Sequence, residues 1–326
     1  MDDDRRDVLF APAAHLDEYR HPLPPISLTG ASARRAGAGT MDDAATSYLL
    51  VFTASFLANA AIRLVGDACL PSLVGRARWT ALTPSQKYAL ALTPNSMFNS
   101  LLAPALVFPA LTRTPPLTKR GKFAVITPSV DGDSSNACAV AIGFMAYDLV
   151  SMLWNYEASV RSNGKGLFHL YVWHHVLSIL FWPVAILNRA FVYFVNWFIL
   201  SEHSSFWLSL RGSMLTLGTI NTPAGLFVQL AFVVSFFGAR VAVMPDLYRS
   251  YVNADWAAVP GWQATIAAWT VPIPSMLNAY WGFLIVKSLA KVALGGGGKK
   301  KKKTTGAGPE TRARGTAAPM GSPKQE

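Results

Sequence analysis

The chain has 326 residues, of which 52% are hydrophobic and only 14% are charged, and its mean hydropathy is +0.29. Soluble domains usually carry about 25% charged residues, so this composition excludes an ordinary soluble globular protein. A net charge of +11 suits nucleic-acid binding, but the excess lies in short loops and one terminal run rather than in a basic soluble domain. We therefore predict an integral, multi-pass membrane protein with no nucleic-acid partner.

The two ends of the chain differ in composition from the middle, which predicts three regions. Residues 1–43 are polar and rich in Pro, Gly, Ala and Arg, a composition typical of a disordered segment. Residues 44–291 hold the apolar runs and are the predicted transmembrane domain. Residues 292–326 form a predicted disordered, polybasic tail. We expect its lysine run to bind anionic lipid head groups; the run consists of Lys299, Lys300, Lys301, Lys302 and Lys303.

Apolar runs of the length needed to cross about 30 Å of hydrocarbon recur along the middle region. They predict an all-α fold, a polytopic transmembrane helix bundle of about seven spans. Six or eight spans remain open, because the first span and the break between the fourth and fifth are weakly defined. The predicted spans are Ala44–Val65, Tyr88–Leu111, Asn136–Tyr156, Leu167–Leu187, Ala190–Leu210, Ala224–Met244 and Thr265–Leu289. Prolines are expected to kink the second and the seventh, because each removes a backbone donor.

The distribution of Lys and Arg among the loops predicts the orientation of the bundle. Lys287, Lys291 and the lysine run place the C-terminus in the cytosol, so seven spans place the N-terminus on the opposite side. Basic residues between Arg113 and Lys122 oppose this orientation, because they fall in a loop that it places outside.

Ionisable side chains interrupt the apolar stretch between Leu167 and Arg211. The interior of a bilayer penalises such groups by a few kcal/mol each, so they usually face the inside of a bundle and mark a function. The residues concerned are His169, His174, His175, Glu202 and His203.

Three spans are predicted to deliver ionisable groups to one depth in the membrane. At about 1.5 Å per helical residue, Asp148 and Glu202 each lie roughly 18 Å into their spans. Counted back along the antiparallel fourth span, His174 lies roughly 20 Å from the same face. Ser205 shares a helix face with Glu202 at the i, i+3 spacing. We predict that these groups, with His175 as an alternative to His174, line one enclosed cavity within roughly 10 Å of one another.

Metal binding is not favoured by the histidine pattern. Membrane di-iron oxygenases need about eight histidines in clustered boxes. This chain has six, and His15 and His21 lie in the predicted disordered head. Cys69 and Cys138 make no thiolate site. The sequence therefore predicts no metal ion and no cofactor.

Several segments, in this order and spacing, resemble the TLC-domain (TRAM/LAG/CLN-like) family of multi-pass membrane proteins. They read IGFMAYDLVSML, HLYVWHHVLSIL, LSEHSSFWLSLR, SFFGARVAVMPDLY and LNAYWGFLIVK. The likeness covers about Ala44–Lys291. The positions that match the family pattern are Asp148, His174, His175, Glu202, Ser204, Arg211, Arg240 and Pro245.

Two departures place the chain closer to the lipid-homeostasis branch of this family than to the ceramide synthases. Many members carry S-x-x-H in the second span, where this chain has asparagine at Asn99. Ceramide synthases carry H-D-x-S-D, where this chain reads Ser201-Glu202-His203-Ser204-Ser205. The resemblance implies a location in the endoplasmic reticulum.

The first functional hypothesis is a protein that handles or senses lipids and contributes to membrane lipid homeostasis. Membrane lipids would then be its partners. The polar layer would bind a lipid head group through Asp148, His174, His175, Glu202 and Ser205.

The alternative is an acyl-CoA-dependent acyltransferase resembling ceramide synthase. His174 or His175 would act as the general base, because imidazole titrates near neutral pH. Asp148 or Glu202 would orient that imidazole and stabilise its cation. Acyl-CoA would then be a further partner.

Overall fold

The computed structural model describes residues 41–113, 123–126 and 132–294. Within these ranges every regular element is a helix, which confirms the predicted all-α fold. Two isolated bridges join Phe123 to Ala254 and Ile126 to Ala190. The lysine run lies outside the described residues, so its contact with anionic lipid stays a prediction.

Most of the described helices are joined by a few residues, whereas 18 residues, 114–131, separate α3 from α4. In chain order they are α1 (Met41–Val74), α2 (Arg76–Ala81), α3 (Pro84–Arg113), α4 (Gly132–Trp154), α5 (Tyr156–Asn163), α6 (Lys165–Leu187), α7 (Val192–Ser201), α8 (His203–Thr216), α9 (Pro223–Phe236), the π-helical turn η1 (Phe237–Val241), α10 (Met244–Val252), the 3₁₀ turn η2 (Trp256–Ala258), α11 (Gly261–Thr270) and α12 (Pro272–Ala293).

Four of the described helical stretches are long and apolar enough to cross a membrane. They are Asp43–Val74, Gly132–Trp154, Lys165–Leu187 and Pro223–Val252, and they match the predicted first, third, fourth and sixth spans. The other predicted spans are helical too: α3, the pair α7 and α8, and the pair α11 and α12. The chain is therefore a multi-pass integral membrane protein built as a helix bundle.

Two predicted spans are interrupted where the sequence analysis expected one helix. The fifth breaks at Glu202, between α7 and α8, where the backbone N–H of Glu202 bonds to the carbonyl of Ile199 three residues back. The seventh breaks at Val271, because Pro272 and Pro274 have no N–H with which to continue the helix. In contrast, α3 runs as one helix through its three prolines.

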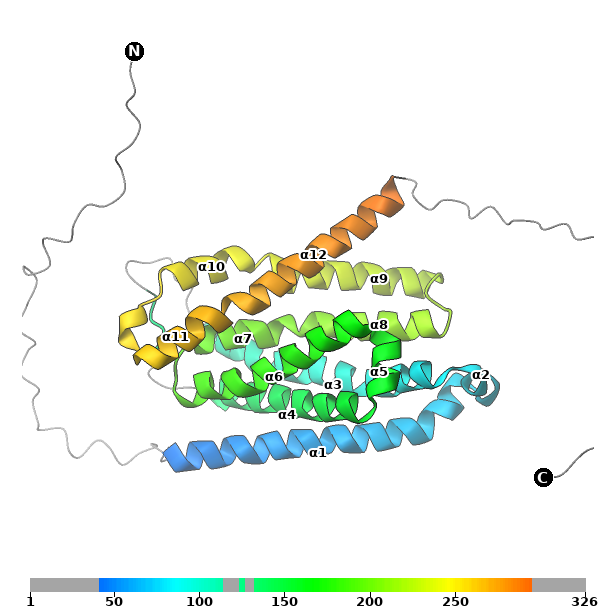
Figure 1. Ribbon diagram of the computed structural model, residues 1–326, viewed down its shortest axis with the longest axis horizontal. Coiled ribbons are helices and arrows are strands. Elements are labelled where there is room, and N and C mark those ends of the chain that lie inside the picture. The colour runs from blue at the N-terminus through cyan, green and yellow to red at the C-terminus, as the bar shows by residue number, and fades with distance from the viewer. Residues whose placement is uncertain (1–40, 114–122, 127–131, 295–326) are drawn as a thin grey trace, which may run out of the picture.

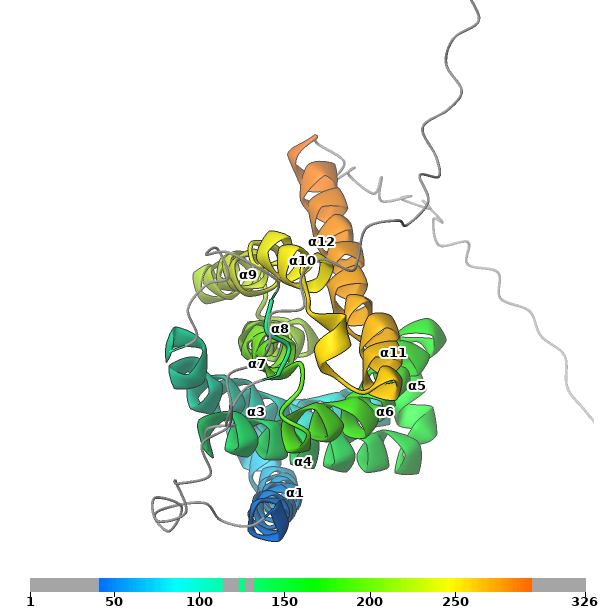
Figure 2. The ribbon, with the colours of Figure 1, turned by 90° about the vertical axis from the view of Figure 1, so that its left-hand side faces the viewer.

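The helix pair α7 and α8 occupies the centre of the bundle. Seen end-on, it lies between a layer of α3, α4 and α6 and a layer of α9, α10 and α12 (Figure 2). In the side view most helices run along the long axis of the bundle, with α1 along one edge and α12 crossing near the other (Figure 1). The break at Glu202 therefore lies inside the bundle rather than on its lipid-facing side.

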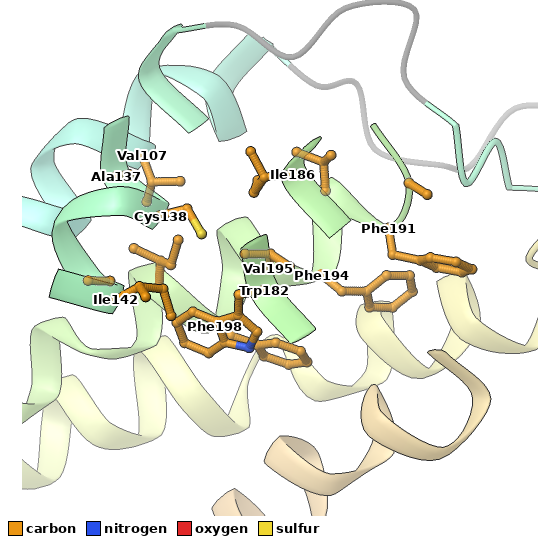
Figure 3. Packing of buried hydrophobic residues seen from close by; sticks show 14 of the residues in the cluster. Val107, Ala137, Cys138, Ile142, Trp182, Ile186, Phe191, Phe194, Val195 and Phe198 are labelled. Carbon is orange, nitrogen blue, oxygen red and sulfur yellow. The ribbon is translucent and has the colours of Figure 1, made fainter. Parts of the chain in front are cut away.

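Aromatic packing holds α6 against α7. Trp182 of α6 stacks on Phe198 of α7, with ring centroids 6.4 Å apart and planes 25° from parallel. Figure 3 shows this pair, with Phe194 and Phe191 continuing the row of rings along the chain. Phe194 is 1% exposed. In a membrane such rings associate by van der Waals packing rather than by removal from water, and this packing fixes α6 against α7.

Close contact between α1 and α4 depends on Gly143. A Cβ atom added at this position would lie 2.6 Å from Cβ of Ser55 and 2.7 Å from the carbonyl oxygen of Phe52. Ser55 also donates a hydrogen bond of 2.8 Å from its Oγ to the carbonyl oxygen of Val140. The two helix backbones can approach this closely because residue 143 has no side chain, as is common between membrane helices.

We therefore predict that Gly143→Ala destabilises the protein by about 1–3 kcal/mol, because the added methyl forces α1 away from α4. Chemical unfolding in detergent micelles measures this difference. The matched control is Gly212→Ala, since Gly212 is helical and a Cβ there meets nothing within 4 Å. Equal unfolding curves for the two variants would contradict the α1–α4 contact.

Candidate functional site

A carboxylate–imidazole pair links α4 to α6. Nε2 of His175 lies 2.8 Å from Oδ2 of Asp148. The His175 side chain is 8% exposed and that of Asp148 18% exposed, so the pair is largely shielded. Nδ1 of His175 is buried and bonds to no described residue. The antiparallel packing of the third and fourth spans thus brings two of the predicted groups into direct contact.

A second polar centre surrounds Arg240, which lies in the π-helical turn η1. Its Nε donates to Oγ of Ser204 at 2.7 Å, and its Nη1 donates to Oδ1 of Asn278 at 3.1 Å. Its Nη2 donates to Oγ of Ser205 at 3.1 Å and lies 3.5 Å from Oε1 of Glu202. Ser205 in turn donates to Oε2 of Glu202 at 3.0 Å. Each nitrogen of the guanidinium therefore donates one hydrogen bond, and the Glu202 carboxylate balances its charge.

Aromatic rings complete the surroundings of this guanidinium. Its carbon Cζ lies 5.7 Å from the ring centroid of Phe236 and 5.8 Å from that of Trp281. Both distances fall within the range of a cation–π attraction. The π-helical turn that carries Arg240 is a rare backbone form that occurs frequently at functional sites.

The two adjacent histidines of α6 have different surroundings. Their ring centroids are 5.4 Å apart, but successive residues of a helix point about 100° away from each other. His175 faces Asp148, whereas His174 faces the side of α7 and α12 and lines a cavity there. No hydrogen bond joins His174 to another of the described residues.

An apolar cavity of about 160 Å³ lies between α6, α7, α11 and α12. Its walls include Leu170, Phe181, Phe194, Ile266 and Ala267.

A second, smaller cavity of about 20 Å³ adjoins the apolar one and has Glu202, Arg240 and Asn278 in its wall. The two cavities share five lining residues, which are His174, Trp182, Phe198, Pro274 and Leu277. We call them together the joined cavities. They make one amphipathic site, with a long apolar part and a compact polar end.

Residues 93–287, more than half of the chain, match the family model described as the TLC domain. The chain belongs to the TLC-domain family. The matched region runs from within α3 to within α12 and contains both polar centres, while α1 precedes it. No curated protein matches the chain in sequence.

Within this TLC domain the predicted polar residues form two neighbouring centres. His174 and Glu202 share the wall of the smaller cavity, and Ser205 is hydrogen-bonded to Glu202. Asp148 and His175 pair with each other, and neither belongs to the described lining of the joined cavities.

Two residues of the TLC-domain site carry roles that sequence reasoning missed. Arg240 matches the family pattern, and an arginine inside an apolar span also indicates a buried partner. The sequence does not single out Asn278, because asparagines in membrane helices commonly form hydrogen bonds between helices without a further role. Conversely, His169 is an exposed side chain that lies outside both centres.

The described part of the TLC domain contains no cluster of side chains that could bind a metal ion. No group of three or more His, Cys, Asp or Glu side chains there could hold a metal ion. The arrangement instead offers hydrogen-bond donors and acceptors beside an apolar cavity, which suits an amphipathic organic ligand.

We predict that Arg240→Met destabilises the TLC domain by about 3–5 kcal/mol, because it leaves the Glu202 carboxylate buried without its cation. The double variant Arg240→Met/Glu202→Gln should recover part of this loss, since it removes the unpaired charge. Chemical unfolding in detergent measures both. If the double variant is no more stable than Arg240→Met, the unpaired Glu202 carboxylate is not the cause of the destabilisation, although it lies 3.5 Å from Arg240 in the unaltered protein.

Proposed function

We propose that this TLC-domain protein handles or senses membrane lipids and thereby contributes to membrane lipid homeostasis, with the endoplasmic reticulum as its membrane. The observation that carries the proposal is the amphipathic form of the joined cavities. An apolar cavity of about 160 Å³ suits part of an acyl chain, and the polar end beside Glu202 and Arg240 suits a head group.

The position of the cavity within the bundle supports the same function. Its walls come from α6, α7, α11 and α12, and three of these helices carry exposed apolar residues outside the lining, namely Leu180, Trp269 and Met276. Exposed apolar side chains on a membrane protein face lipid rather than water. A lipid could therefore pass from the bilayer into the cavity without exposing its chain to water.

Acyl transfer is the second candidate function, and one observation favours it. The 2.8 Å contact between Asp148 and His175 is the arrangement in which a carboxylate orients a basic imidazole. However, His175 is not among the residues that line the joined cavities. His174 does border both cavities but has no carboxylate bonded to it. Lipid handling without acyl transfer therefore has the stronger geometric support.

Filling the apolar cavity tests the lipid-handling proposal. Ala267 is 5% exposed and lines this cavity, so Ala267→Phe should occupy the space of an acyl chain. In lipid nanodiscs, we expect the variant to reduce photocrosslinking of a diazirine-labelled fatty alcohol to α6, α7, α11 and α12 by about tenfold. Peptide mapping by mass spectrometry measures the labelling.

The control for this experiment is Ala290→Phe, because Ala290 lies on the same helix pair but is exposed and outside the cavity lining. Labelling of the cavity helices should be unchanged there. Equal labelling of Ala267→Phe and the unaltered protein would contradict lipid binding in the joined cavities.

The acyltransferase alternative predicts product from acyl-CoA and a panel of amines and lipid alcohols in liposomes. Product that disappears in His174→Ala or His175→Ala, while His169→Ala retains it, would favour the enzyme. His169 is a suitable control because it is on α6 but exposed. Absence of product from the unaltered protein across the panel is the result we expect, and chromatographic product analysis measures it.

A further inference from the structure

We infer that the joined cavities select a single-chain lipid whose head group is a single uncharged hydroxyl, as in a long-chain alcohol. The inference rests on the proposed lipid-handling function and names the chemical class of its ligand. It follows from the charge balance of the polar end, from the bonding capacity of His174 and from the size of the apolar cavity.

The polar end of the joined cavities is already neutral in charge. Glu202 and Arg240 lie 3.5 Å apart and compensate each other. Arg240 also donates to Ser204, Ser205 and Asn278. A head group with a net charge would therefore enter a site whose two charges already compensate each other, and burial of an unpaired charge is strongly unfavourable.

His174 has hydrogen-bonding groups that no described residue uses. It lies at the boundary of the two cavities and has no hydrogen bond to another described residue. A neutral imidazole has one donor nitrogen and one acceptor nitrogen. A hydroxyl group is both donor and acceptor, so it matches either nitrogen, whereas an ammonium only donates and a carboxylate only accepts.

The volume of the apolar cavity favours a single chain. A cavity of about 150 Å³ in another protein accommodates a benzene molecule, and this one measures about 160 Å³. That space matches a segment of one acyl chain better than two chains side by side or the fused rings of a sterol. The rest of a single chain would extend from the cavity into the bilayer.

Competition among single-chain lipids of matched length, with a sterol for comparison, tests the inference. The protein in phosphatidylcholine nanodiscs is labelled with a diazirine-bearing hexadecanol while hexadecanol, hexadecylamine, palmitate or cholesterol is titrated into the bilayer. We expect hexadecanol to displace the probe at about tenfold lower mole fraction than the amine, the carboxylate or the sterol.

Two substitutions test whether His174 forms the hydrogen bond to the hydroxyl. His174→Leu should abolish the preference for the alcohol, because it removes both the donor and the acceptor. His174→Gln should keep most of it, because its amide has both. His169→Leu, on the exposed face of the same helix, should leave the preference unchanged. A preference for the alcohol that persists in His174→Leu would overturn the role of His174.

The outcomes separate this inference from the function on which it rests. If hexadecylamine, palmitate or cholesterol displaces the probe as well as hexadecanol does, the neutral single-chain class is wrong while lipid binding stands. If the probe labels the cavity helices no more in the unaltered protein than in Ala267→Phe, both the ligand class and the proposed function are wrong.

Discussion

The architecture of this TLC domain depends on burying the guanidinium of Arg240 within an apolar bundle. A buried cation without partners costs several kcal/mol, so the chain must bring acceptors to it. They come from two places far apart in the sequence: the start of α8 with Glu202, and Asn278 on α12. This requirement holds the central helix pair, the π-helical turn and the last helix together around one point.

Three interruptions of the predicted spans lie beside the joined cavities. The fifth predicted span breaks at Glu202, the sixth contains the π-helical turn η1, and the seventh breaks at Val271. In a membrane, irregular backbone is tolerated where it is buried in protein or lines a cavity. Glu202 and Arg240 line the smaller cavity, and Val271 lines the larger one. The interruptions thus border the joined cavities.

Two polar centres lie back to back on α6. His175 pairs with Asp148 on the α4 side, while His174 meets the joined cavities on the side of α7 and α12. Their rings are 5.4 Å apart, so the centres are close without sharing a hydrogen bond. The Asp148–His175 hydrogen bond joins α4 to α6. His174 has no hydrogen bond to another described residue and lines both cavities, so a ligand in the joined cavities would meet His174 rather than His175.

The sequence by itself determined the membrane class and the helical fold, and it predicted that ionisable groups in the apolar spans face the inside of the bundle. Hydropathy and run length are local properties, and an ionisable group in an apolar run needs a buried partner wherever the helices go. Only the tertiary structure decided that Asp148 meets His175, that Glu202 meets Arg240, and that Asn278 joins them. Depth along a helix can be counted from the sequence, but rotation about its axis cannot when the helix is apolar all round, as α6 is. Packing against the neighbouring helices sets that rotation, and with it the partner that each polar side chain finds.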